Sequence, residues 1–499
     1  MRVNWQIRYI SLACLIWIIV SSACSPLPSK KEEYLPPYRI AMQPHTQSHL
    51  DQIGPVPRYD IDVSVDVDRL TIIGHESVLY TNRQSEQLDE LYFRLYPNLP
   101  AYGGEMQITR VQIGGKEVGA TFQADRTALR VPLPSPLLVN RNVRVDLEFL
   151  LRVEHQDEGQ GLLGESQGIL SLPNFYPVLA VHQNGAWDLS IGPDFADAVF
   201  TDIALYRVDI DVPADMVVVS TGSVVGEETT TEGRRVIHCV SGPVRDFGLI
   251  MSRAFEKQTI TIRGIVINSY HLPQDSQSGH SALWRAAAAI QAYSDAFSEY
   301  PYAKFDVVEA PLGKRGMEYP ALVLIGSEVY RTDKKKLEPL VVHETAHQWW
   351  YNLVGSDPVN DPAIDEGLAE YSLHFYYEGV YGKRHAEDLA HTRWVEPYEF
   401  IKEKGLDAPV EQPAIAFNRD NYETIVHAKS GVLYNDLRHY IGDAAFDEAL
   451  RHYLSSYRYR IAPTGAFLGI ASGTTPRSLE AHAAKWRQVP TSGENPDAE

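Results

Sequence analysis

The stretch LVVHETAHQWW (residues 340–350), followed along the chain by DPAIDEGLAEY, decides the fold. Its two histidines, His343 and His347, are four residues apart, so on a helix their imidazoles share one face. Zinc prefers such nitrogen ligands, and a catalytic zinc site leaves one of its four positions to water. Glu344 stands between the histidines, where a general base is needed, and Glu366 in the second stretch supplies a third ligand. The two stretches together predict a His-His-Glu site for one zinc ion.

The same histidine pair also has a purely structural interpretation, as two core histidines with satisfied hydrogen bonds. The surrounding helix is otherwise apolar or aromatic, so Glu344 would be buried there without a partner, which is costly. A metal ion and its water remove that objection. Glu370, four residues after Glu366, is interpreted as an exposed acid rather than as a partner of a ligand.

Length and composition indicate a multidomain globular protein. The chain has 499 residues, which favours two to three domains. Apolar residues make up 44% and charged residues 22%, as is usual for globular proteins. The formal net charge of -20 argues against nucleic acid as a partner, because such binding needs a basic surface.

Residues 1–24 have the pattern of an export signal. A positively charged start precedes the apolar run Ile10–Val20, which is short for a permanent membrane anchor. The small residues before Cys24 resemble a bacterial lipoprotein cleavage site, with Cys24 as the lipidated residue. The alternative is an ordinary signal peptide cut near Ala23. We therefore expect export from a bacterial cell, with the protein either lipid-anchored to the outer face of a membrane or secreted.

The rest of the chain divides into a tether, two domains and a tail. Residues 25–45 are rich in Pro, Ser and charge and predict an extended tether. Residues 46–256 alternate apolar and polar positions, as in YDIDVSVDV, which predicts an antiparallel, sandwich-like β domain. Residues 257–487 predict a catalytic domain that begins as mixed α/β and ends α-helical, and residues 488–499 a disordered polar tail. In the catalytic domain we expect strands near 260–268 and 305–309 and helices near 281–300, 343–351, 366–378, 430–441 and 477–486.

A second motif, Gly316-Met317-Glu318-Tyr319-Pro320, precedes the histidine stretch. Alone it reads as a turn that enters an edge strand, with Glu318 solvated. Together with HETAHQWW and the spacing to Glu366, it resembles the gluzincin zinc aminopeptidases, the family of aminopeptidase N and leukotriene hydrolase. The resemblance extends to SEYPYAKFDVVEAP and GVLYNDLRHYIGDAAFDEALRHY, and it is strongest over residues 295–460.

The resemblance implies an α+β multidomain fold, in which the β domain precedes a thermolysin-like zinc peptidase domain. It implies a zinc-dependent aminopeptidase that acts on peptides with a free N-terminus, in a short bacterial form without the C-terminal helical-repeat domain. Gly316, Met317 and Glu318 would lie along the substrate backbone, and Glu318 would bind the free amino group. Tyr319 stands where the family usually has Asn, so the contacts of that Asn are in doubt.

One position departs from the family pattern in a way that bears on catalysis. The family usually has a Tyr that donates a hydrogen bond to the transition-state oxyanion, and His427 stands at that position. Three interpretations follow: His427 replaces the Tyr as donor, Tyr422 reaches in instead, or the enzyme has lost this donor.

Two other functions remain as alternatives to an aminopeptidase. One is a zinc-bearing peptide-binding protein of low activity. The other is a different zinc hydrolase, either an endopeptidase or an epoxide hydrolase.

Overall fold

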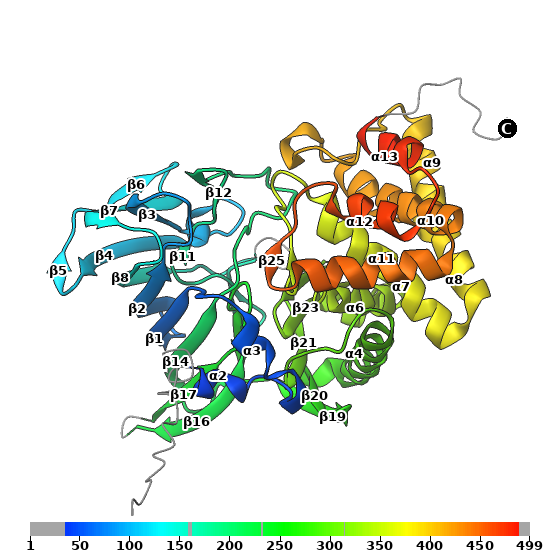
Figure 1. Ribbon diagram of the computed structural model, residues 1–499. Helices are drawn as coiled ribbons and strands as arrows, with labels where there is room; N and C mark the ends of the chain where they lie inside the picture. Colours follow the sequence, from blue (N-terminus) through cyan, green and yellow to red (C-terminus); the bar gives the residue numbers. More distant parts are fainter. Residues whose placement is uncertain (1–34, 158–161, 231–232, 314, 489–499) are drawn as a thin grey trace, which may run out of the picture.

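The computed structural model describes residues 35–157, 162–230, 233–313 and 315–488. The predicted export signal with Cys24 lies outside these residues, as does nearly all of the predicted polar tail. Figure 1 shows two parts side by side, a β-rich part formed by the first half of the chain and a largely helical part formed by the second. This order of a β domain before a catalytic α/β and helical domain is the one predicted.

The β domain is organised around an eight-stranded sheet. Alternate residues of its strand β1 (Arg58–Asp66) are buried, among them Tyr59, Ile61 and Val63, so the period-two pattern does place one face on the core. Strands β1 and β14 pair in parallel, and the other neighbours in this sheet pair antiparallel. In spatial order the strands are β16 (Ser223–Thr229), β17 (Arg234–Val240), β14 (Leu205–Pro213), β1 (Arg58–Asp66), β2 (Thr71–Thr81), β8 (Asn142–Arg152), β4 (Glu105–Ile113) and β5 (Lys116–Glu117).

Smaller sheets complete the β domain, and most of their buried side chains join the same core. One has the order β15 (Val217–Ser220), β18 (Leu249–Ser252), β10 (Ile169–Leu172) and β9 (Gly164–Ser166). Another has the order β11 (Val178–Leu179), β3 (Leu88–Arg94), β7 (Ala128–Leu137) and β6 (Thr121–Gln123), and β12 (His182–Gln183) pairs with β13 (Ala186–Trp187).

The end of the predicted tether is folded in the structure. From Leu35 onward the chain forms α2 (Pro36–Arg39), η1 (Pro44–Thr46) and α3 (His49–Gln52). The backbone N–H of Gln43 and the hydroxyl of Thr46 both donate to the carbonyl of Pro301, at 2.9 and 2.7 Å. The boundary predicted at residue 45 therefore differs from the structure, because this Pro-rich segment has apolar side chains, such as Leu35, that find a core to pack on.

A five-stranded sheet opens the catalytic domain. The run 260–268, predicted as one strand, is instead a hairpin that turns at Arg263 and Gly264, whose φ angles are 48° and 80°. Two successive positive φ angles fit a two-residue type I′ turn, and Gly264 supplies one at no steric cost. The sheet order is β19 (Glu256–Ile262), β20 (Ile265–His271), β21 (Lys304–Ala310), β23 (Leu322–Gly326) and β22 (Gly316–Tyr319), so β22 is an edge strand.

Helices follow the sheet and form most of the second part of the molecule (Figure 1). Helix α10 begins and ends where the sequence predicts, and α6 and α7 carry the two halves of the zinc motif. The α-helices are α4 (Ser276–Ala296), α5 (Ser327–Arg331), α6 (Leu337–Ala346), α7 (Ala363–Tyr381), α8 (Lys383–Leu389), α9 (Glu396–Glu403), α10 (Ser430–Ile441), α11 (Asp443–Tyr457), α12 (Ala466–Thr474) and α13 (Glu480–Arg487). Two further segments are π-helical, η5 (Ala390–Val395) and η7 (Thr424–Lys429). Short 3-10 turns are η2 (Tyr96–Asn98), η3 (Pro273–Asp275), η4 (Lys334–Lys336) and η6 (Ala414–Ala416). The short strand β24 (Val354–Gly355) pairs with β25 (Arg460–Ile461).

A buried guanidinium joins the two domains. Arg245 of the β domain is 1% exposed and donates to the carbonyls of Thr201 (3.0 Å), Arg460 (2.7 Å) and Tyr351. A Cβ at Gly355 would overlap this guanidinium, so the catalytic domain leaves room for it with a glycine. Because charge-assisted hydrogen bonds of this kind are strong, they hold the β domain in one position against the catalytic domain.

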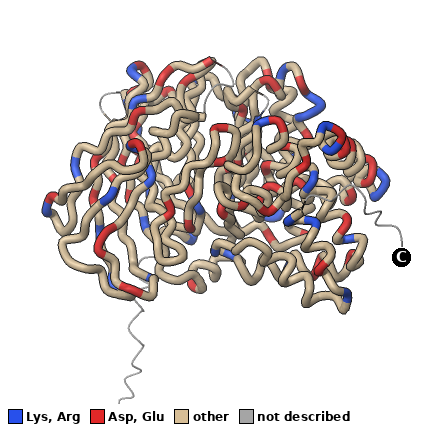
Figure 2. Tube along the Cα trace, turned by 90° about the horizontal axis from the view of Figure 1, so that it is seen from above, with Lys and Arg blue, Asp and Glu red and all other residues tan. Residues whose placement is uncertain are grey.

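Basic and acidic residues are interspersed along the described part of the chain without a large run of either sign (Figure 2). Figure 2 shows Lys and Arg positions scattered among Asp and Glu positions along the chain. Among the helices of the described ranges, none combines the length and the apolar character that crossing a bilayer requires.

Candidate active site

Helices α6 and α7 bring the three predicted metal ligands together. Nε2 of His343 lies 3.2 Å from Nε2 of His347 and 3.1 Å from Oε2 of Glu366, and Nε2 of His347 lies 3.6 Å from the same Oε2. Ligand atoms at zinc distances of about 2.0–2.1 Å in a tetrahedron stand about 3.3 Å apart. The three atoms therefore have the spacing that one tetrahedral zinc ion requires, and the residues fit the predicted metal.

Each histidine is held through its other ring nitrogen. Nδ1 of His347 lies 2.9 Å from the carbonyl of Trp350, to which it donates. Nδ1 of His343 lies 3.2 Å from Oε2 of Glu370. Such contacts leave Nε2 free for a metal, and they are typical of metal-binding histidines.

The structure shows that the predicted exposure of Glu370 is wrong. Its side chain is 1% exposed, and it accepts hydrogen bonds from Arg393 (2.5 and 2.9 Å) and from Nε1 of Trp394 (2.6 Å). Burial raises the pKa of Glu370, but Arg393 and His343 outweigh it and hold the pKa well below its usual range. The sequence could not reveal these partners, because Arg393 and Trp394 come from a π-helical segment after α8.

Glu344 faces the ligands from the same helix and touches strand β22. A Cβ at Gly316 would overlap the Glu344 carboxylate, so this glycine lets the strand approach the predicted general base directly. The amide of Gln348 ties the strand end to the ligand helix, since its Oε1 accepts from the backbone of Ala321 (2.8 Å) and its Nε2 donates to the carbonyl of Tyr319 (3.0 Å).

The two faces of β22 have different surroundings. Polar atoms of Glu318, Glu344 and His347 lie within 4.8 Å of one another, so Glu318 points into the site rather than into solvent. The side chain of Met317 packs on a separate apolar cluster with Leu162. Gly316 and Glu318 are alternate residues of the strand, so both face the site. Met317, which lies between them, faces the other way, and only its backbone borders the site.

Asp197 is a site residue that the sequence analysis missed. It lies in the long loop between β13 and β14 of the β domain, and its carboxylate is within 4.8 Å of those of Glu318 and Glu366. Burial, together with the charges of Glu366 and Asp365, raises the pKa of Asp197 to about 8. No local pattern marks this residue, because only the docking of the two domains brings it to the metal ligands.

Both predicted oxyanion donors lie near the metal ligands. His427, on η7, has Nε2 2.9 Å from Oε2 of Glu366. Tyr422 is 6% exposed, and its ring packs edge-on against Phe195 of the β domain at 5.3 Å between centroids. Burial raises the pKa of the Tyr422 hydroxyl, and the nearby carboxylates of Asp197 and Glu366 raise it further.

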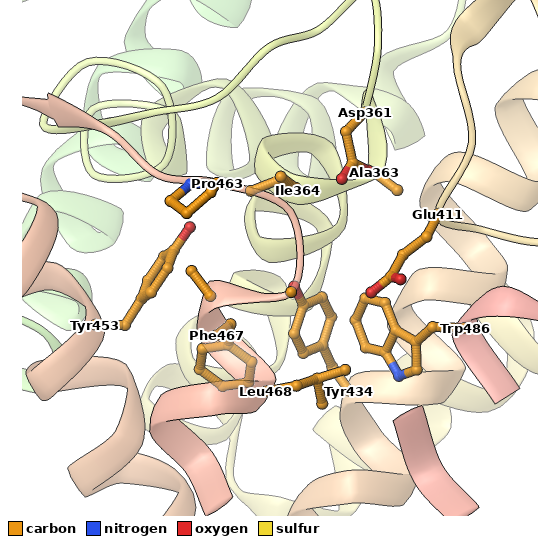
Figure 3. A pocket seen from close by; sticks show the side chains of 12 residues that line it. Asp361, Ala363, Ile364, Glu411, Tyr434, Tyr453, Pro463, Phe467, Leu468 and Trp486 are labelled. Carbon is orange, nitrogen blue, oxygen red and sulfur yellow. The ribbon is translucent and has the colours of Figure 1, made fainter. Parts of the chain in front are cut away.

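A cavity behind the first turn of α7 is distinct from this site. Figure 3 shows Asp361 and Glu411 on one side of it and the rings of Tyr434, Phe467 and Trp486 around the rest. Its volume of about 20 Å³ holds about one water molecule, and none of the predicted site residues lines it. The cavity is therefore too small to bind a peptide.

Comparison with known proteins shows a family match over part of the chain. Residues 282–486 match the family described as "Peptidase family M1 domain". The puromycin-sensitive aminopeptidase of Caenorhabditis elegans is 25% identical over 317 residues, which are 59% of this chain and 33% of that protein. The human endoplasmic reticulum aminopeptidase 1 is 24% identical over 255 residues, 46% of this chain and 27% of that protein. The matches thus span a third or less of the length of these relatives.

Solved structures show the same fold over both domains. The crystal structure of an M1 zinc metallopeptidase from Deinococcus radiodurans has a TM-score of 0.66 at 18% identity, covering 89% of this chain and 96% of that one. A mutant of the enzyme from the same organism, bound to a Tyr-Ser-Ala substrate, has a TM-score of 0.65 at 18% identity and covers 87% and 95%. The resemblance inferred from the motifs is confirmed: residues 282–486 match the peptidase family M1 domain, and the chain has the two-domain fold of the solved M1 metallopeptidases.

Proposed function

We propose that the protein is an aminopeptidase that uses one zinc ion to remove N-terminal residues from peptides. The observation that carries the proposal is the convergence of the His343, His347 and Glu366 ligand atoms beside Glu344, with Glu318 and Asp197 next to them. The M1 domain match and the aminopeptidase relatives support the same conclusion.

The protein groups around the ligands divide the chemistry of peptide hydrolysis. Bound zinc lowers the pKa of its water and polarises the scissile carbonyl. Glu344 accepts a proton from the attacking water and delivers it to the leaving amine, which is general base and then general acid catalysis. His427 and Tyr422 are the side chains close enough to donate a hydrogen bond where negative charge develops on the carbonyl oxygen.

Glu318 and Asp197 make the proposed enzyme an exopeptidase. Their carboxyl groups lie together beside the predicted metal ligands, where burial and repulsion from neighbouring carboxylates raise the pKa of each. An ammonium group placed between them favours their ionised forms and pairs with them. A peptide whose amino group sits at this point presents its first peptide bond to Glu344. The site therefore selects substrates by their free N-terminus.

The test compares free and acetylated peptides of the same sequence. We expect chelator-sensitive release of the first residue from the free peptide and none from the acetylated one. Glu318→Gln and Asp197→Asn should each raise KM by about tenfold or more for the free peptide and leave zinc content unchanged, because they weaken a charge-assisted contact. The exposed Glu448→Gln is the matched control. Equal cleavage of both peptides would favour an endopeptidase, and no cleavage by the zinc-loaded protein would favour a binding protein.

We also propose that the protein is exported and is attached to a membrane by a lipid at Cys24. The charged and apolar pattern of residues 1–24 supports this, with small residues before the cysteine. Metabolic labelling with a radioactive fatty acid should mark the wild-type protein and not the Cys24→Ser variant. An unlabelled wild-type protein recovered outside the cell would instead indicate an ordinary cleaved signal.

A further inference from the structure

His427 has both ring nitrogens directed at oxygen atoms. Nδ1 lies 2.9 Å from the carbonyl oxygen of Glu423, one helical turn earlier, and Nε2 lies 2.9 Å from Oε2 of Glu366. A carbonyl can only accept, so Nδ1 carries a hydrogen and donates it. A neutral imidazole has only one N–H, and Nε2 then turns a lone pair toward a carboxylate oxygen. This contact is favourable only if the ring takes up a second proton or a cation lies between the two atoms.

The two metal-ligand histidines show the same arrangement. His347 donates from Nδ1 to the Trp350 carbonyl, and His343 has Nδ1 beside Glu370. All three rings direct Nε2 at Oε2 of Glu366, at 3.1 Å from His343, 3.6 Å from His347 and 2.9 Å from His427. The ligand atoms of His343, Glu366 and His427 are within 4.8 Å of one another. His427 thus directs Nε2 at the same carboxylate oxygen as the two histidines of the predicted metal site.

A divalent ion bound at Glu366 disfavours a second proton on His427, because both carry positive charge. An imidazolium would place a positive charge next to the ion, while a neutral ring offers the ion a lone pair. We propose that His427 is a fourth protein ligand, which completes the coordination of the metal in the resting enzyme. The inference rests on the metal site of the proposed function.

This ligand closes the position that a catalytic zinc site otherwise leaves to water. Hydrolysis then requires His427 to move aside when a substrate binds. Its side chain is 25% exposed, against 7% for His343 and 1% for His347, so it is the ligand with most room to leave. It also sits on the π-helical segment η7, a form of helix that occurs often at functional sites. The hydroxyl of Tyr422 is buried beside Asp197 and Glu366, so it is the remaining candidate for the oxyanion donor.

The first experiment counts ligands in the intact protein. X-ray absorption spectroscopy of the zinc-loaded wild-type protein should show three imidazole ligands and one carboxylate, and His427→Gln should show two imidazoles. Two imidazoles in the wild-type protein would overturn the inference. A wild-type protein that takes up no zinc would overturn the proposed metal site as well, so the two failures are distinguishable.

The second experiment measures zinc affinity by competition with a chelator. Loss of a partner of a ligand typically costs about 10- to 100-fold in metal affinity, so loss of a ligand should cost at least tenfold in His427→Phe and His427→Gln. The exposed His452→Phe is the control and should match wild type. If His427 were only an imidazolium beside the metal, its removal would leave zinc affinity unchanged or raise it. That outcome, in variants whose circular dichroism shows a retained fold, would also overturn the inference.

Discussion

At the scale of single residues, the site places a buried acid where catalysis needs a base. Glu344 is 5% exposed, and burial raises its pKa while the neighbouring His343 and His347 lower it. The carboxylate is held beside the ligands by its helix and has strand β22 against it. Its role therefore depends on position more than on any local motif around it.

Replacing Glu344 with Gln tests this role. The amide keeps the shape of the side chain and removes the base, so peptide cleavage should fall by about 100- to 10,000-fold. Zinc content, measured by atomic absorption, should stay at the wild-type level, because Glu344 is not among the three convergent ligands. Cleavage within tenfold of wild type would assign the base to another group.

At the scale of elements, the approach of β22 to α6 depends on a missing side chain. Gly316→Ala places a Cβ on the Glu344 carboxylate, which must then move away from the ligands. We expect a loss of activity of about tenfold or more with the fold retained, since misplacing a reacting group by about 1 Å costs on the order of 100-fold. Gly119→Ala, whose Cβ meets nothing within 4 Å, is the control. Equal kcat/KM for the two variants would contradict the close contact.

The contact between Glu370 of α7 and Arg393 of η5 leads to a second prediction at this scale. Glu370 supports His343 and is paired with Arg393, so Glu370→Gln should lower zinc affinity by about 10- to 100-fold. Chelator competition measures this directly. If zinc affinity is unchanged and only the unfolding temperature falls, the contact with His343 is structural and not a support for the metal.

At the scale of the whole molecule, buried acids tie stability to pH. Asp361 is 4% exposed, and burial raises its pKa from 3.8 to about 7, although a hydrogen bond with Thr464 opposes the rise. The folded protein keeps this proton at pH values where the unfolded chain has released it. Asp361 therefore lowers the free energy of unfolding, and it lowers it more as pH rises from about 4 to about 7.

Asp361→Asn removes this titration. At pH 8 the variant should be more stable than wild type by about 1–3 kcal/mol, because the amide is neutral and avoids the cost of burying the charged carboxylate. At pH 4 the difference should be much smaller, because Asp361 is then protonated in the folded state and still close to half protonated in the unfolded state. Urea unfolding at the two pH values measures the difference, and an advantage that is the same at both would contradict the buried titration.

The sequence by itself determined the parts of this protein that depend on local spacing. Alternation predicted the buried face of β1, and the i, i+4 relation of His343 and His347 predicted a shared face whatever the rest of the chain does. The prediction from sequence failed where one local pattern fits two structures. At residues 260–268 the turn at Arg263 and Gly264 splits the run predicted as one strand into two.

Only the tertiary structure decided which distant groups meet at the predicted metal site. Asp197 comes from the β domain and Glu370 gains Arg393 from another helix, and neither neighbour is close in sequence. Periodicity reports which face of an element is apolar, but not which element will cover it. The charges around the site depend on how the two domains are docked. Arg245 holds them together by donating hydrogen bonds to backbone carbonyls of both domains.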